Sequence, residues 1–460
     1  MTRMILGAFQ TMNPNGTIGS SWAEPGNTSL GYLGVDYWTR LARRLEEGGF
    51  DFLFFADSYG YPLIDGEVLP HALSAGMYVP MGDPIVLASC VAAATTRLGV
   101  VVTSSTTVER PAAVARRYAT LDHLSGGRIG WNIVTGAAQA SSAELFGEAL
   151  IPHDDRYAQA ADHVEICLNL WERSWDDDAL RLDRETGVFA DPEKVHLVEH
   201  SGKFLSSRGI FALPPSPQRS PLLVQAGTSK AGRSFAAGYA ELVFLGGGDT
   251  PVIAAQIADI RNRVDQAGRP RDSVKFVVGA HFVVGTTAEQ AQQKRARMLE
   301  MATLEHAATT YAWVTGIDLT RLALDAPMPR LHTEQGQTSV DRFTDPETGI
   351  RNTVREILVE YRDNGINGTV FVGDPITIAD QVEQFLEQTG ADGFLVQPHL
   401  TPGTYDDLID LLVPELTRRG LLEQESPTPG TLRARLFPEH GDRLPATHTG
   451  GARRNTGGAA

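Results

Sequence analysis

The residues best suited to chemistry stand at the ends of short apolar runs, and most are uncharged hydrogen-bonding groups. One run ends at Asp57, the next passes through Thr103, and a third carries Asn132 and Thr135. One carboxylate among amides and hydroxyls suits the binding of a polar heterocycle. Hydrolysis would call for paired carboxylates, or for a nucleophile with a base beside it. The rim therefore favours cofactor binding over hydrolysis.

A short segment, Gly227-Thr228-Ser229, follows another apolar run and precedes a helical pattern. Its backbone N–H groups could cradle a phosphate at the start of the helix. Ser229 could equally serve as the cap of that helix, and the two roles are compatible. Neither G-x-G-x-x-G nor G-x-x-x-x-G-K-[ST] occurs in the chain. The sequence thus offers no evident nicotinamide site of its own.

His153 and Tyr157 open a long helical pattern and are four residues apart, so they share one face and could reach a single ligand. The alternative is a plain helix start at the surface, where Asp154 and Asp155 favour the helix dipole. The residues alone leave these readings even. None of the twelve histidines belongs to a metal-binding motif, so we expect no metal site.

Four aromatic residues could form the walls of a substrate pocket, with ordinary core packing as the alternative for each. They are Phe9, Trp22, Tyr59 and Trp131.

The elements that must position these residues are eight apolar runs, most of them followed by an amphipathic stretch. Continuous apolar runs are typical of parallel strands covered on both faces. Eight alternating units favour a closed (β/α)₈ barrel over a doubly wound open sheet. In such barrels the site lies at the C-terminal ends of the strands. The runs are Met4–Gln10, Phe52–Ser58, Leu98–Ser105, Arg128–Thr135, Leu222–Gly227, Leu242–Gly247, Val274–Gly285 and Gly393–Pro398.

Two long segments interrupt this alternation within a single domain over residues 1–437. They cover about 137–220 and 300–368, and we expect both to form lids over the barrel mouth. The tail at 438–460 is rich in Gly, Thr, Arg and Pro, which predicts a disordered segment.

Composition limits the possible partners and the location of the protein. The formal net charge is −16, which disfavours binding to nucleic acid and to anionic membranes. No apolar stretch reaches the roughly 18 residues of a membrane span, and the N-terminus lacks a signal region, so we expect a cytoplasmic protein. Cys90 and Cys167 both lie in apolar helical patterns and are expected to be buried free thiols.

Longer motifs add a resemblance that runs in order along nearly the whole chain. The sequence resembles the bacterial luciferase-like superfamily, in the branch of the nitrilotriacetate, dibenzothiophene sulfone and long-chain alkane monooxygenases. The matching motifs include FLFFADS at Phe52–Ser58, ARRYATLDHLSGGRIGWNIVTG at Ala115–Gly136, HDDRYAQAADHVEICLNLWERSWDDDAL at His153–Leu180, PSPQRSPLLVQAGTSKAGRSFAAGYAE at Pro215–Glu241, GDPITIADQVEQF at Gly373–Phe385 and TLRARLF at Thr431–Phe437.

The resemblance implies a two-component monooxygenase on a (β/α)₈ barrel. Reduced FMN (FMNH₂) would come from a separate NAD(P)H:flavin reductase. With O₂ it would oxygenate a small organic substrate through a flavin (hydro)peroxide. The family commonly forms homodimers or homotetramers.

By carry-over onto matching positions, each candidate residue gains a role. Asp57 and Thr103 would contact the flavin ring region, with Asn132 and Thr135 beside it. His153 and Tyr157 would approach the flavin or its phosphate. Gly227, Thr228 and Ser229 would hold the phosphate. His153 is the candidate catalytic residue for proton transfer, because the ordinary pKa of His is about 6.5.

Two alternatives stay open at this point. A deazaflavin-dependent reductase or dehydrogenase would use a similar barrel, although the motifs around Asn132 and His153 argue against it. A barrel that binds flavin without turnover is the other. The first-strand loop, Gln10–Gly16, lacks the His that relatives often carry before a Trp, which puts the substrate in doubt.

Overall fold

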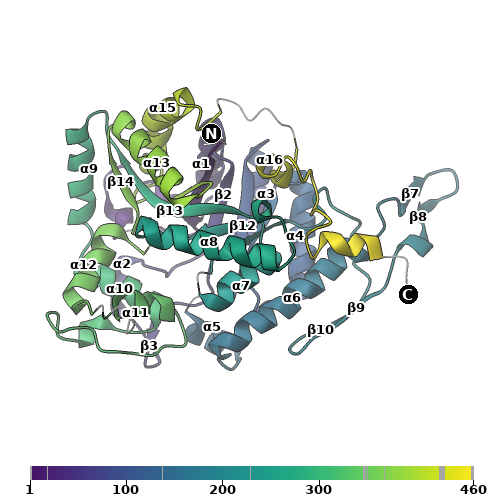
Figure 1. The fold of residues 1–460 in the computed structure, drawn as a ribbon, viewed down its shortest axis with the longest axis horizontal. Helices are drawn as coiled ribbons and strands as arrows, with labels where there is room; N and C mark the ends of the chain where they lie inside the picture. Colours follow the sequence, from purple (N-terminus) through teal and green to yellow (C-terminus); the bar gives the residue numbers. More distant parts are fainter. Residues whose placement is uncertain are drawn as a thin grey trace.

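Eight parallel strands form a closed barrel in the computed structural model (Figure 1). Each strand pairs with the next, and the last, β15, pairs with β1, so the sheet has no break. This closure confirms the predicted barrel and excludes the open sheet. The barrel strands are β1 (Ile5–Thr11), β2 (Phe52–Ala56), β5 (Gly99–Ser105), β6 (Ile129–Val134), β11 (Leu222–Gln225), β12 (Leu242–Leu245), β13 (Lys275–Val284) and β15 (Gly393–Val396).

The structure describes residues 3–17, 19–136, 138–227, 229–344, 349, 351–366, 368–423 and 430–456. The side chains at 153, 154, 455 and 456 are also outside the description.

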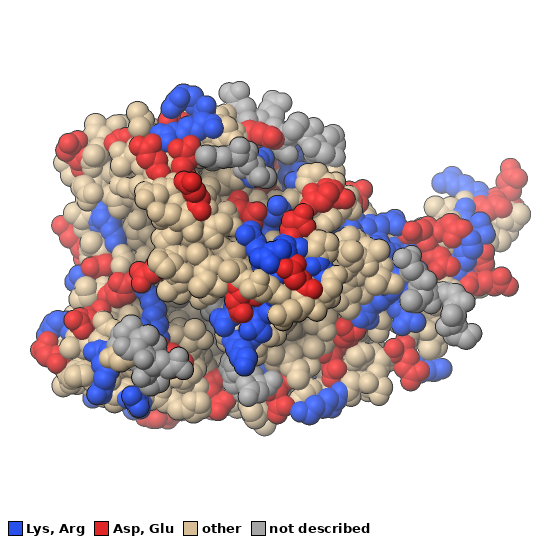
Figure 2. Space-filling model, in the orientation of Figure 1, with Lys and Arg blue, Asp and Glu red and all other residues tan. Residues whose placement is uncertain are grey.

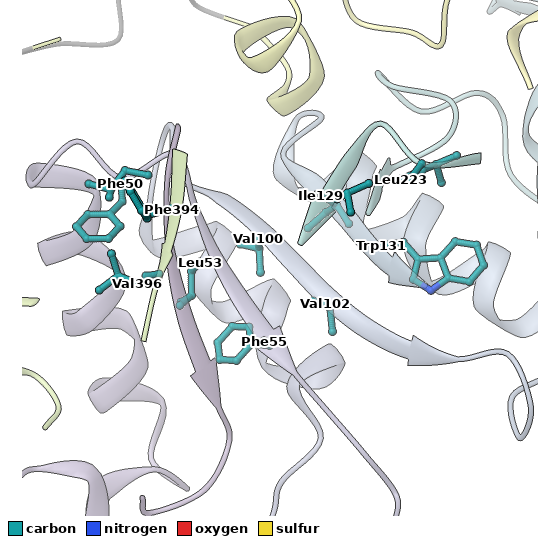
Figure 3. Close-up of a cluster of buried hydrophobic side chains, with 14 of the residues drawn as sticks. Phe50, Leu53, Phe55, Val100, Val102, Ile129, Trp131, Leu223, Phe394 and Val396 are labelled. Carbon is teal, nitrogen blue, oxygen red and sulfur yellow. The ribbon is translucent and has the colours of Figure 1, made fainter. Parts of the chain in front are cut away.

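The strands are apolar on both faces because both faces are covered. On β2, Phe52 and Phe54 pack inside the barrel, whereas Leu53 and Phe55 pack outward against the helices. Figure 3 shows part of this outer layer, with Phe55, Val102 and neighbouring side chains between sheet and helices. An alternating pattern would have left one face polar, so the continuous runs were a reliable signal.

Helices surround the barrel on its outside. The main ones are α1 (Val35–Glu47), α3 (Pro84–Ala94), α4 (Pro111–Ser125), α6 (His153–Arg173), α7 (Lys230–Tyr239), α8 (Thr250–Gln266), α9 (Ala288–Glu300), α13 (Pro375–Thr389), α14 (Gly403–Asp407) and α15 (Val413–Arg418), the last two joined by a π-helical turn at Leu408–Leu412. A further strand, β14 (Val370–Gly373), pairs with the second half of β13.

The first long segment contributes less to the barrel mouth than the sequence predicts. Helix α5 (Gln139–Phe146) and the start of α6 lie near the mouth, but two hairpins follow that extend to the side of the molecule (Figure 1). They are β7 (Leu180–Asp183) with β8 (Val188–Ala190), and β9 (Val198–Ser201) with β10 (Ser206–Gly209). The prediction of a lid over all of 137–220 was therefore wrong for the hairpins.

The second long segment is helical and has a core of its own. It contains α10 (Leu304–Thr315), α11 (Gln337–Thr344) and α12 (Val354–Asn364). Their buried side chains, among them Tyr311, Phe343 and Tyr361, form a cluster separate from the barrel core. A short helix, α2 (Pro70–Ala75), and the β3–β4 hairpin (Leu63–Ile64 and Glu67–Val68) lie against α10.

Residues 438–456 of the tail contact the rest of the protein, which differs from the disorder predicted for 438–460; residues 457–460 lie outside the described residues. His448 is fully buried and its ring bonds the carbonyl of Tyr239 at 2.9 Å. A 3-10 turn at Gly451–Thr456 packs against α6, and Arg453 pairs with Glu165 there. These contacts are tertiary and leave no periodic pattern in the sequence.

Just before the tail, helix α16 (Leu432–Leu436) closes the N-terminal end of the barrel. Leu432, Leu436 and Phe437 pack against the inward-facing strand residues. The other end of the barrel is thereby left as the place for a site.

The surface mixes acidic and basic side chains on the face shown in Figure 2. Within the described residues, no helix is both long and apolar enough to cross a membrane. Both cysteines are free thiols. Cys167 is buried as expected, but Cys90 lies on the exposed face of α3, which corrects its predicted burial.

Candidate active site

A cavity of about 420 Å³ opens at the C-terminal ends of the barrel strands. Its floor is aromatic: the ring of Phe9 stacks on Phe54 at 5.8 Å between centroids, and Phe244 meets Phe54 edge-on at 5.9 Å. Each ring comes from a different strand and points inward, so the floor is rigid and excludes water from below.

A polar layer lies above this floor. Thr103 donates its hydroxyl proton to the carbonyl of Phe55 at 2.8 Å and accepts a hydrogen bond from the Asn132 amide at 2.8 Å. These two hydrogen bonds fix the orientation of the Asn132 amide, so that its NH₂ group is bonded to Thr103 and its oxygen is not. Asn132 Oδ1 and Gln225 Oε1 are both buried and lack a partner among the described residues. Since buried polar atoms are almost always bonded, these two oxygens mark a place for a ligand with N–H or O–H donors.

Asp57 stands at the end of β2 and also lines the cavity. Its carboxylate accepts a hydrogen bond from the backbone N–H of Ser58 at 2.9 Å. Burial, helped by the nearby negative charges of Asp83 and Glu109, raises the pKa of Asp57 to about 7 despite that bond. A carboxyl that titrates near neutral pH can hold or release a proton at the cavity wall.

At one edge of the cavity, the turn after β11 meets the start of α7. Ser229 caps this helix, accepting a hydrogen bond from the N–H of Gly232 at 3.1 Å. The Tyr157 hydroxyl bonds Ser229, while burial raises the Tyr157 pKa. A Cβ at Gly227 would overlap the Gln225 amide and the Tyr157 hydroxyl. A larger residue at this turn would therefore displace the ends of these two side chains, and the turn beside a helix start could hold an anion through its backbone N–H groups.

The wall opposite the strand ends comes from the loop after α2 and from the helical segment at 300–368, which together we call the lid. Met77, Tyr78 and Met81 follow α2, Trp313 lies on α10, and Ile366 follows α12. Sequence reasoning predicted that 300–368 would cover the mouth but named none of these side chains. No sequence motif identifies these residues, because their place in the wall depends on how distant segments fold over the barrel.

Seven of the predicted site residues line this one cavity. They are Phe9, Asp57, Thr103, Asn132, Thr135, Tyr157 and Gly227, with Ser229 bonded to Tyr157 beside them. Thr228 and the side chain of His153, the predicted proton-transfer residue, lie outside the described residues. Phe54, Phe244, Gln225 and Gln397 also line the cavity and were not predicted. The alternation along each strand could have identified Phe54, because it shares a face with Phe52.

The other three predicted pocket aromatics lie elsewhere. Trp131 is fully buried on the outer face of β6, between the barrel and α6, and so belongs to the core (Figure 3). Trp22 donates its indole N–H to the carbonyl of Ala75 and ties the first loop to α2. Tyr59 stacks edge-on against Phe146 beside a small side pocket that Asp57 shares. Core packing was the correct alternative for Trp131.

A comparison with protein-family models covers most of the chain. The family model described as luciferase-like monooxygenase matches residues 18–393. The chain belongs to this family. The branch named from the motifs is also confirmed by its relatives.

Three members of this family illustrate its range. The dimethyl-sulfide monooxygenase of Hyphomicrobium sulfonivorans is 36% identical over 447 residues, covering 97% of this chain and 92% of that protein. Nitrilotriacetate monooxygenase component A of Aminobacter aminovorans is 30% identical over 409 residues, covering 88% and 90%. The crystal structure of riboflavin lyase (RcaE) with modified FMN and riboflavin superposes with a TM-score of 0.93 at 38% identity, covering 98% of this chain and 100% of that one.

Within the residues that the structure describes, no group of three or more His, Cys, Asp or Glu side chains is arranged to hold a metal ion.

Proposed function

We propose that the protein is a two-component flavin-dependent monooxygenase. It would take FMNH₂ from a separate reductase and use O₂ to place one oxygen atom in a small organic substrate, releasing the other as water. The observation that carries the proposal is the pair of buried, unpartnered oxygens of Asn132 and Gln225 beside the Gly227 turn. Together they offer acceptors for a heterocycle and a cradle for its phosphate.

The residues present fit FMN at both ends. Gly227 and the capped start of α7 would hold the phosphate, with Tyr157 and Ser229 supplying hydroxyl groups. Asn132 and Gln225 would accept hydrogen bonds from N–H groups of the ring. Asp57 and Thr103 line the same wall, next to the place where the ring would lie. The relative crystallised with modified FMN supports this choice of cofactor.

When bound, reduced flavin supplies the electrons that activate O₂. The protein's own part is to orient the reactants, exclude water and manage a proton. Phe9, Phe54 and Phe244 keep water out from below, and the lid side chains do so from above. Asp57, with its pKa near 7, can hold a proton beside the ring. His153 stays a prediction as a second proton-transfer group.

The proposal also includes a partner protein and an assembly. One of them is named as component A of its monooxygenase, which supports a separate reductase here as well. A homodimer or homotetramer remains our expectation for the assembly.

A coupled assay tests the function. The purified protein is supplied with FMN, NADH and a separate flavin reductase under ¹⁸O₂, together with a panel of small organic compounds. The proposal predicts a product that carries one ¹⁸O atom only when both proteins are present. Oxygen consumption that ends entirely as H₂O₂ across the panel would instead support a flavin-binding barrel without turnover.

A further inference from the structure

The lid half of the cavity differs chemically from the strand half. Its side chains are thioethers, aromatic rings and an aliphatic group, from Met77, Tyr78, Met81, Trp313 and Ile366. Among the described residues that line the cavity there is no Lys, Arg or His. The one acidic side chain in that lining is Asp57, on the strand side. Asn13, Asn15 and Thr17 of the first loop add uncharged polar groups to the lining. The compartment left for a substrate is thus mainly apolar and lacks described cations.

Two aromatic rings give this compartment a fixed wall. Tyr78 and Trp313 stack with centroids 4.3 Å apart and planes 6° from parallel. The Tyr78 hydroxyl donates a hydrogen bond of 3.1 Å to the hydroxyl of Thr310. Thr310 lies on α10, one turn before Trp313. The loop after α2 and the lid helix are joined at this point.

One polar atom in this wall has no partner. The indole N–H of Trp313 is buried, and no acceptor among the described residues bonds it. An indole N–H can only donate, and leaving it buried without an acceptor is unfavourable. Trp22 donates its indole N–H to Ala75, and the indole N–H of Trp131 in the core also lacks a described partner. Trp313 differs from both because it lines the cavity. A bound substrate is one group able to supply the acceptor that Trp313 lacks.

We propose that the substrate is an uncharged, mainly apolar molecule with a hydrogen-bond acceptor that takes the Trp313 indole proton. This inference rests on the monooxygenase function proposed above and names the substrate class for it. A polycarboxylate would have to bury several negative charges with no described cation beside them, which is strongly unfavourable. A neutral ring or chain carrying a sulfone, sulfoxide or lactam oxygen fits the lining and satisfies the donor.

The test measures binding of matched probes to the FMN-loaded protein by calorimetry. Each neutral probe with an acceptor is paired with its parent lacking one: dibenzothiophene sulfone with dibenzothiophene, and 2-quinolinone with naphthalene. Nitrilotriacetate is the anionic probe. Trp313→Phe removes the donor and keeps a ring in the stack. Tyr78→Phe is the matched control, because it removes a polar atom that already has a partner in Thr310.

We expect at least one acceptor-bearing probe to bind more tightly than its parent. Trp313→Phe should weaken that probe about tenfold, the size of one hydrogen bond, and leave the parent unchanged. Tyr78→Phe should leave the difference in affinity between each probe and its parent unchanged. Nitrilotriacetate binding more tightly than every neutral probe, binding of none of the neutral probes, or equal weakening of probe and parent by Trp313→Phe would each overturn the inference.

FMN binding to the same samples, followed by quenching of flavin fluorescence, separates this inference from the function on which it rests. A protein that does not bind FMN contradicts the proposed function itself. A protein that binds FMN in the wild type and in both variants, but prefers the polycarboxylate, contradicts the substrate class alone.

Discussion

The barrel has a buried polar cluster at each end, and the two differ in whether their bonds are complete. At the N-terminal end, Arg433 forms a two-point ion pair with Glu241, at 2.7 and 2.9 Å, and donates further bonds to four backbone carbonyls. At the C-terminal end, Asn132 and Gln225 each keep an oxygen without a partner among the described residues. In Figure 1, α16, which carries Arg433, lies in the upper middle of the view, and the lid helices α10, α11 and α12 lie at the lower left.

The Arg433–Glu241 pair stabilises the fold, whereas we infer that Asn132 and Gln225 bind a ligand. A buried ion pair with every bond made contributes to the native structure, and breaking it leaves an uncompensated charge. A buried polar group with a bond missing costs stability until something binds. Mutations at the two ends should therefore separate stability from flavin binding.

The largest change in stability is expected at the N-terminal end of the barrel, which α16 closes. Arg433→Ala leaves Glu241 buried without its partner and should lower the free energy of unfolding by about 3–5 kcal/mol. Urea denaturation followed by circular dichroism measures it. The double variant Arg433→Met with Glu241→Met removes both charges and should recover most of the loss. A loss below about 1 kcal/mol for the single variant would mean that the pair does not hold α16 in place.

The next effect is expected at the glycine turn. Gly227→Ala places a Cβ where the ends of Gln225 and Tyr157 lie, so these two proposed flavin-binding side chains must shift and FMN affinity should fall about 100-fold. The matched control is Gly238→Ala on α7, where a Cβ meets open space and affinity should not change. Equal affinities for the two variants in a fluorescence titration would place the phosphate elsewhere.

A smaller effect is expected at the helix cap. Ser229→Ala should weaken FMN about tenfold but leave riboflavin, which has no phosphate, unaffected. It should also cost about 1 kcal/mol of stability through the lost cap. Thr287→Ala removes an equivalent cap from α9, where Thr287 accepts from Gln290, and controls for that stability loss. Weakening of riboflavin to the same degree would contradict a phosphate role for Ser229.

The smallest effect concerns the proton on Asp57. Its pKa is raised to about 7, so the folded state holds a proton that the unfolded chain loses near pH 4. The stability of the wild type relative to Asp57→Asn should therefore fall, by about 1–2 kcal/mol, as pH rises from 5 to 8. Glu241 has the opposite sign, because Arg433 lowers its pKa and its contribution is lost as pH falls. Denaturation curves of the two ligand-free proteins from pH 5 to 8 measure this difference in stability. A difference that does not change with pH would mean that Asp57 is ionised throughout.

Sequence predicted the strands well because each strand leaves a local mark. All eight apolar runs became barrel strands, and the polar residues that follow them, such as Asp57 and Thr103, met at one cavity as parallel strands require. Trp131 was misplaced because an apolar run does not tell which side chains face inward. Trp313 and His448 were beyond local reasoning, since their positions depend on contacts between distant segments.

An anaerobic titration of the purified protein with FMNH₂ and, in parallel, with a reduced deazaflavin measures directly whether the cavity binds reduced flavin. We predict saturable binding of FMNH₂ that is tighter than binding of the deazaflavin, and that weakens in Ser229→Ala. Preference for the deazaflavin, or no binding of FMNH₂, would contradict the account of this cavity as the flavin site of a monooxygenase.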